Sequence, residues 1–93
     1  EPTPGHTPGH VSVRIRSDGK EAVITGDCMH HPSQMAHPEW KCVFDHDGTL
    51  AQTTRRDFLS RYADTPTLVI GTHFAAITAG HIVREGDAYR FEV

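Results

Sequence analysis

Apolar and polar residues alternate along residues 11–16, and the apolar run 22–24 follows, with Thr25 after it. Alternation with a period of two is typical of a half-buried strand. Between the two runs, Asp18-Gly19 can supply the positive φ angles that a tight hairpin turn requires. The pattern therefore predicts a β-hairpin whose second strand ends at Thr25-Gly26-Asp27.

The middle of the chain has a helical period. From about Thr49 to Ala63 the apolar residues recur near one helical face: Ala51, Phe58, Leu59 and Tyr62. Asp47 or Thr49 can cap the helix, and Thr65-Pro66 ends it. Three arginines are expected to face water: Arg55, Arg56 and Arg61. The pattern predicts one main helix.

Short strands follow the helix at residues 67–70, 82–84 and 88–91, and the last two pair as a hairpin. We therefore expect an α/β fold with one mixed sheet, two hairpins and one main helix. Residues 28–48 are expected to be irregular. Their content of Met, His and aromatic residues suits a pocket wall better than a solvated loop. Trp40 and Phe44 are expected to pack.

With 93 residues, the chain is one small domain or part of one. A unit of this size buries about 60–65% of its unfolded surface, so the core is marginal. The net charge is −3 and no basic cluster exceeds Arg55-Arg56, which argues against nucleic acid and membranes as partners. No apolar run approaches transmembrane length. We expect a cytoplasmic protein in which Cys28 and Cys42 are reduced thiols.

Eight histidines are unusual in so short a chain. One of them, His6, lies in the segment Thr-Pro-Gly-His-Thr-Pro-Gly-His of residues 3–10, where proline and glycine restrict the loop backbone. Asp27 and His73 each follow an apolar strand and a glycine. Imidazole and carboxylate suit zinc, iron or manganese. The alternatives are a surface histidine at position 6, a turn-forming aspartate at position 27 and a structural histidine at position 73.

These motifs, in this order and ending in Gly71-Thr72-His73-Phe74, resemble the second half of a metallo-β-lactamase-fold hydrolase. The resemblance covers essentially the whole chain. It implies that residues 1–93 are the C-terminal portion of the domain, half of a four-layer αββα sandwich. The N-terminal half, with its His-x-His-x-Asp-His motif, is absent from this sequence, and the start at Glu1 leads us to expect a truncated or processed chain.

The absent N-terminal half is the expected partner, because the sheet face that it would cover should be apolar and exposed. Association between copies of the chain through that face is the alternative. The resemblance also implies roles for individual residues. His6 and His73 would bind metal, Asp27 would bridge two metals as the catalytic carboxylate, and His10 would support the site from behind.

The stretch that follows Asp27 is similar to the lactonase, esterase and phosphotriesterase-like branch of the family. In that branch three residues would face a small-molecule substrate: Met29, His30 and Phe74. For His30, a surface position without a role is the alternative. Cys28 lies beside Asp27, but no general base at a fixed spacing supports it as a nucleophile.

The implied activity is metal-dependent hydrolysis of a lactone, ester or phosphotriester by a hydroxide activated between two divalent ions. Zinc is the preferred metal, with iron, manganese or cobalt as alternatives. Because this chain holds only part of the ligand set, we expect the 93 residues alone to be inactive. Two other functions stay open: a non-catalytic half-domain that serves in assembly, and a glyoxalase-II-like thioesterase.

Overall fold

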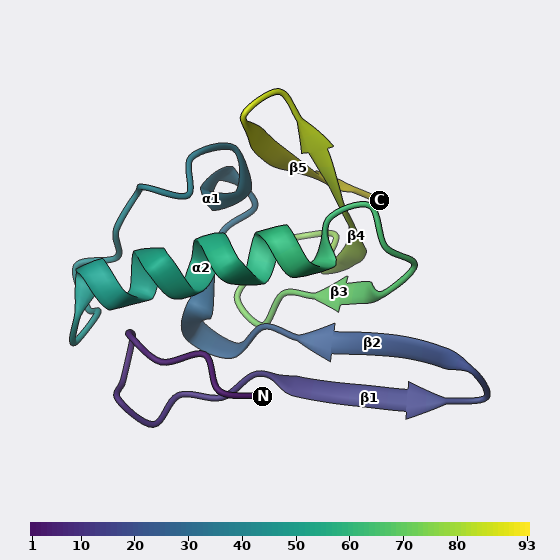
Figure 1. The fold of residues 1–93 in the computed structure, drawn as a ribbon, viewed down its shortest axis with the longest axis horizontal. Helices are drawn as coiled ribbons and strands as arrows, with labels where there is room; N and C mark the ends of the chain where they lie inside the picture. The colour runs from purple at the N-terminus through teal and green to yellow at the C-terminus, as the bar shows by residue number, and fades with distance from the viewer.

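The computed structural model describes all 93 residues, Glu1–Val93. Five strands form one mixed sheet in chain order: β1 (Val13–Ser17), β2 (Lys20–Ile24), β3 (Leu68–Ile70), β4 (Ala79–Glu85) and β5 (Ala88–Glu92) (Figure 1). β2 and β3 are parallel, and all other neighbours are antiparallel. A parallel pair needs a crossover, which the helix α2 (Gly48–Tyr62) supplies. β4 begins three residues before its predicted start.

Helix α2 lies across the sheet (Figure 1). Asp47 caps it, because the Leu50 backbone N–H donates to Asp47 Oδ1 over 3.0 Å. The predicted apolar face is buried as expected. The prediction for Arg55 is wrong, since only 1% of this residue is exposed. Position 55 lies four residues after Ala51 and four before Leu59, so the helical spacing puts it in the middle of the buried face.

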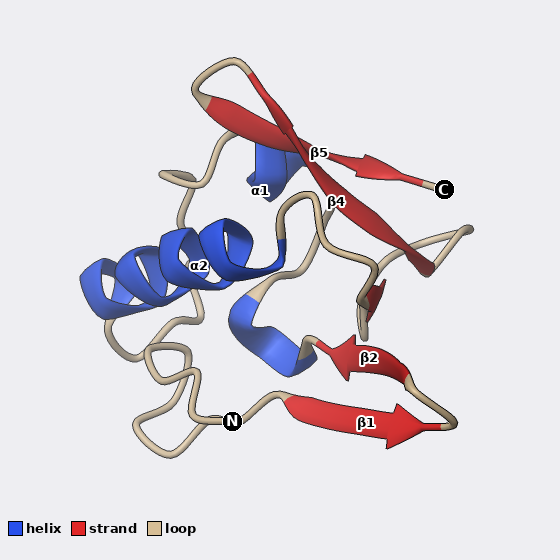
Figure 2. Ribbon diagram, turned by 45° about the vertical axis from the view of Figure 1, so that its right-hand side comes forward, coloured by secondary structure: helices blue, strands red, loops and turns tan.

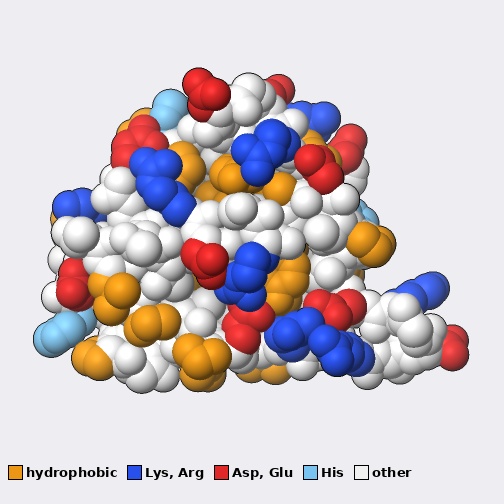
Figure 3. Space-filling model, in the orientation of Figure 1, with side chains coloured by type: hydrophobic (Ala, Val, Ile, Leu, Met, Phe, Trp, Pro, Cys, Tyr) orange, Lys and Arg blue, Asp and Glu red, His pale blue; other side chains and the backbone are white.

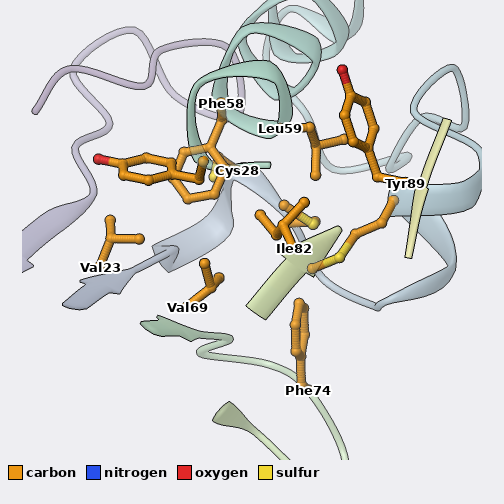
Figure 4. Close-up of a cluster of buried hydrophobic side chains, with 11 residues drawn as sticks. Val23, Cys28, Phe58, Leu59, Val69, Phe74, Ile82 and Tyr89 are labelled. Carbon is orange, nitrogen blue, oxygen red and sulfur yellow. The ribbon is translucent and has the colours of Figure 1, made fainter. Parts of the chain in front are cut away.

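The core lies between α2 and the sheet (Figure 4). Phe58 and Leu59 come from the helix, whereas Val23, Val69 and Ile82 come from three strands. The remaining buried apolar side chains are Cys28, Met29, Met35, Tyr62, Phe74 and Tyr89. Together they make one contiguous hydrophobic cluster, so a single small core holds the helix on the sheet.

The segment predicted to be irregular contains two short helices, η1 (Gly26–Cys28) and α1 (Ser33–Ala36). α1 packs beside β5, as Figure 2 shows. Neither Trp40 nor Phe44 packs in the core, since they are 50% and 82% exposed, although the Trp40 ring stacks on His37 with centroids 4.1 Å apart. The residues of this segment that reach the core are Cys28, Met29 and Met35.

One face of β1, β2 and β3 is not covered by a helix. Its apolar side chains, which we call the open sheet face, are Val13, Ile15, Ala22, Ile24, Leu68 and Ile70. They share a face because side chains alternate along a strand and because Val13 pairs with Ile24, which pairs with Ile70. Val13 is 51% exposed and Ile15 44%. The expected apolar sheet face is therefore present.

Charge is mixed on the surface that Figure 3 shows, where acidic and basic side chains are interspersed and form no patch of a single sign. None of the helices combines the length and the apolar character that crossing a bilayer demands. A hollow in the surface lies at the turn end of the β1–β2 hairpin, lined by residues such as Ile15, Lys20 and Leu68. None of the predicted site residues lines it.

Candidate metal centre

His6 is held by main-chain contacts of its loop with the start of α2. The Asp47 backbone N–H donates to Gly5 O, and the His46 N–H donates to His6 O, both over 2.9 Å. Gly5 has a φ of +135°, and a Cβ atom there would lie 2.3 Å from the Ala51 backbone. Only glycine allows the loop to approach the helix this closely. The backbone that carries the His6 imidazole is thereby fixed.

Asp27 and His73 are brought together by the parallel pair β2 and β3, whose carboxyl ends meet at one edge of the sheet. Two reciprocal hydrogen bonds join the loops that follow. The Gly26 N–H donates to Thr72 Oγ1 over 3.0 Å, and the Thr72 N–H donates to Thr25 Oγ1 over 3.3 Å. Thr25, which precedes Gly26, and Thr72, which precedes His73, therefore hold the two loops together and align the two candidate ligands.

The Asp27 carboxylate lies between two imidazoles. Its Oδ2 is 3.3 Å from His6 Nε2, and its Oδ1 contacts His73 Nε2. Partial burial raises the pKa of Asp27, but the hydrogen bond to His73 and the charge of His6 outweigh this, and the pKa is lowered from its ordinary value. An ionised carboxylate with one oxygen toward each imidazole can bridge two cations.

His30 lies in the same cluster. His6, Asp27 and His30 each offer a ligand atom within 4.8 Å of the others. The His30 ring also stacks on His73, with centroids 5.1 Å apart. Its Nδ1 is the one buried side-chain nitrogen or oxygen without a hydrogen-bond partner. Burial lowers the pKa of His30, which favours the neutral imidazole. This nitrogen and oxygen donor set fits a zinc-type metal.

His10 lies behind the cluster and contacts the backbone of Asp27. Its Nε2 accepts the Asp27 N–H over 2.7 Å, so its Nδ1 carries the proton and donates to Thr3 O over 3.0 Å. Gly26 makes this contact possible, because a Cβ atom there would lie 2.6 Å from His10 Nε2. Both ring nitrogens are used, so His10 can position Asp27 but has no free nitrogen for a metal.

Two of the residues expected to face a substrate lie elsewhere. Met29 has no exposed surface and Phe74 is 4% exposed. Phe74 packs edge-to-face on Phe91, with ring centroids 5.3 Å apart. Both side chains belong to the core, because the chain turns inward directly after η1 and after Thr72-His73. Of the three expected residues, only His30 lies with the candidate ligands.

Sequence reasoning missed two buried charged residues beside the cluster. Asp45 has a side chain that is 1% exposed, and its Oδ1 lies 2.8 Å from His6 Nδ1. Arg55 donates to three backbone carbonyls, those of Cys28, Pro38 and Trp40, over 2.8–3.2 Å. A signal was available for Arg55 alone, since its helical spacing matches that of the buried apolar residues.

Cys28 does not have the properties of a nucleophile. The side chain is buried, and burial raises the pKa of the thiol to about 11. A thiol with this pKa is almost entirely protonated at neutral pH and is a poor nucleophile. Both cysteines are free. The chemistry of the site therefore depends on the His and Asp cluster.

Known structures share this arrangement of strands and helix. AidC, described as a dizinc quorum-quenching lactonase in complex with the product N-hexanoyl-L-homoserine, matches with a TM-score of 0.90 and 26% identity over 98% of this chain. AbOPH, described as a hydrolase in the β-lactamase superfamily, matches with a TM-score of 0.89 and 28% identity over 98%. A probable metal-dependent hydrolase from Staphylococcus aureus matches in fold, with a TM-score of 0.69 and 22% identity over 97%.

No protein-family model and no curated protein matches the sequence. The chain spans 31% of AidC, 32% of AbOPH and 33% of the staphylococcal protein. The α/β class, with one mixed sheet and one main helix, is confirmed, and so is the resemblance on which the site was predicted. The chain has the fold of one part of the β-lactamase-superfamily hydrolases that it matches.

Proposed function

We propose that this chain carries part of the active site of a metal-dependent hydrolase that acts on a lactone, ester or phosphotriester. The observation that carries the proposal is the position of Asp27, with Oδ2 toward His6 and Oδ1 toward His73. In this arrangement each imidazole would hold one divalent ion, and the carboxylate would bind both. The dizinc description of AidC, which has a similar fold, supports two ions and favours zinc.

Two divalent ions bound here would supply a hydroxide at neutral pH by lowering the pKa of water from 15.7 toward about 7. The protein's own groups would do the rest. His6 and His73 would fix the positions of the ions, and His10 would hold the Asp27 backbone through its 2.7 Å hydrogen bond. His30, neutral and with an unpaired ring nitrogen, would bind an oxygen of the substrate or complete the ligand set.

Three or four ligands cannot close two metal sites, so the rest of the site must come from elsewhere. We infer that residues 1–93 are the C-terminal portion of a longer domain whose N-terminal half brings a His-x-His-x-Asp-His motif. That half would pack on the open sheet face. The similarity to a lactonase favours a lactone among the candidate substrates, and a small apolar acyl chain would suit a site beside the core.

The test is Asp27→Ala in the complete protein that carries this chain, with Asp87→Ala as the control for loss of one exposed carboxylate. Metal content is measured by atomic spectroscopy, and turnover is measured on an N-acyl homoserine lactone, an aryl ester and an aryl phosphotriester. We expect Asp27→Ala to lose metal and turnover together, while Asp87→Ala keeps both. Wild-type metal content and turnover in Asp27→Ala would refute the bridging role.

A further inference from the structure

Asp45 contacts His6 at Nδ1, whereas Asp27 lies at Nε2, the other nitrogen of the ring. We propose that Asp45 is a positioning residue: by accepting a hydrogen bond from the Nδ1–H of His6, it holds this imidazole in the tautomer whose Nε2 lone pair faces Asp27. The inference rests on the proposed function, because it treats His6 as a metal ligand. A carboxylate or carbonyl on the far nitrogen of a ligating histidine fixes both the orientation and the basicity of the ring.

The geometry around His6 is the first support. One ring nitrogen, Nδ1, is 2.8 Å from Asp45 Oδ1, and the other, Nε2, is 3.3 Å from Asp27 Oδ2. Both neighbours are carboxylates, which only accept hydrogen bonds when ionised, and the shorter contact, to Asp45, places the single proton of the neutral imidazole on Nδ1. In the neutral imidazole the lone pair is then on Nε2, the nitrogen that points into the cluster.

The burial of Asp45 is the second support. Its side chain is 1% exposed, whereas the side chain of His6 is 17% exposed. Desolvation makes an isolated buried carboxylate costly, so a carboxylate at this depth needs specific partners. It has two: Oδ1 binds His6 Nδ1, and Oδ2 accepts the Cys42 N–H over 3.3 Å. The charge of the buried Arg55 lies close enough to interact with it.

The main chain fixes Asp45 relative to His6. The two residues after Asp45 donate their N–H groups to the oxygens of His6 and Gly5 over 2.9 Å. The carboxylate is thus tied to the ligand loop by the backbone of the next two residues and by its own side chain. A contact that only anchored the loop would not need the carboxylate, because the two main-chain bonds already do so.

Asp45→Asn separates hydrogen-bond chemistry from packing, because the two side chains have the same shape. The amide has one acceptor, but the site has two donors, His6 Nδ1 and the Cys42 N–H. If the amide oxygen turns to Cys42, the NH₂ group faces Nδ1 and forces the proton onto Nε2, the ligating nitrogen. Asp47→Asn is the matched control, because it removes a charge two residues away and asparagine also caps helices well.

Two measurements on the complete protein test the proposal. Zinc affinity, from competition with a chelator, should fall about 10- to 100-fold in Asp45→Asn and stay unchanged in Asp47→Asn. Side-chain ¹⁵N shifts of histidine-labelled, zinc-free protein at pH 8.5 report the tautomer, and the His6 signals are identified by their loss in His6→Gln. We expect Nδ1–H in the wild type and Nε2–H in Asp45→Asn.

Asp45→Leu has a similar shape and no acceptor, so it should also give Nε2–H. Nδ1–H in folded Asp45→Leu would overturn the inference, even if zinc binding were weaker, since the carboxylate would then not set the tautomer. If Asp45→Asn does not fold, Asp45→Glu takes its place, because glutamate keeps an acceptor-only carboxylate and should keep Nδ1–H on His6. Nε2–H in folded Asp45→Glu would overturn the inference. Failure of the proposed function is recognised separately, by wild-type zinc affinity in His6→Gln.

Discussion

Replacing Gly26 by alanine should disturb both the fold and the candidate site, through two effects that the structure allows us to separate. Gly26 has a φ of +61°, and in this region an L-residue costs about 1–2 kcal/mol. The added Cβ would also lie 2.6 Å from His10 Nε2 and 2.9 Å from its Cε1. His10 must then move, which breaks its hydrogen bond from the Asp27 N–H at a cost of about 0.5–1.5 kcal/mol.

The sum predicts that Gly26→Ala lowers the free energy of unfolding by about 1.5–3.5 kcal/mol. Gly19→Ala is the control, because Gly19 has a φ of +76° but a Cβ atom added there would have no neighbour within 4 Å. Only the backbone cost should remain there. Urea unfolding followed by circular dichroism gives both values, and metal affinity should fall in Gly26→Ala alone.

A double mutant makes the reasoning refutable. With His10→Ala in the background there is no ring for the new Cβ to displace, so Gly26→Ala should then cost only about 1–2 kcal/mol more, like Gly19→Ala. If Gly26→Ala and Gly19→Ala cost the same with His10 present, and metal affinity is equal in both, the contact between His10 and Asp27 does not position the carboxylate.

Two further predictions concern the buried polar groups. Arg55→Met should lower the free energy of unfolding in urea by about 3 kcal/mol or more, because it leaves three backbone carbonyls without donors. Arg56→Met, on the exposed side of the helix, should change it little. Equal effects of the two substitutions would contradict the burial of Arg55. At pH 8, iodoacetamide should modify Cys42 and leave Cys28 intact until the protein unfolds. Burial raises the pKa of Cys28 from 9.0 to about 11, so the neutral thiol is favoured in the folded state. The free energy of unfolding should therefore be level below pH 9 and fall as the pH rises from 9 to 11. A flat profile between these two pH values would argue against the burial of Cys28.

The elements predicted best were those whose signal is local. Asp18 and Gly19 have φ values of +55° and +76°, as the expected turn demands, and α2 buries the face that its period indicates. The grouping of Asp27 with His73 could also be expected, because both follow strands, and parallel strands end at one edge of a sheet. In these cases the pattern within a few residues determines the outcome.

The partners of Arg55 and Asp45 could not be predicted in this way. The helical spacing of Arg55 indicates its burial, but the groups that it binds are main-chain carbonyls 15 to 27 residues away, which leave no mark on the sequence. Asp45 binds a histidine 39 residues earlier in the chain, so its role depends on how two loops meet. His30 was predicted as a substrate contact because histidine serves ligands and substrates alike, and only its distance from His6 and Asp27 places it in the cluster.

A charge placed on the open sheet face should have opposite effects in the isolated chain and in the complete protein. Val13 and Ile15 are about half exposed in the chain alone, and an apolar face of this kind favours association. We expect the isolated 93-residue chain to self-associate, to bind metal weakly and to lack hydrolase activity. Val13→Lys should reduce its association in sedimentation velocity. Val43→Lys is the control, because Val43 is 90% exposed and lies outside this face.

In the complete protein the N-terminal half would cover the open sheet face, so the same lysine would be buried there. Burying an unpaired charge is strongly unfavourable, and Val13→Lys should therefore destabilise the complete protein while it improves the behaviour of the isolated chain. Adding a separately produced N-terminal half to the wild-type chain should restore metal binding and turnover together, and adding it to the Val13→Lys chain should not. A monomeric isolated chain that binds two metals and turns over substrate would show that the site is completed in another way. Equal stability of the complete wild-type and Val13→Lys proteins would show that nothing packs on this face, which would remove the physical basis for assigning the missing ligands to a second half.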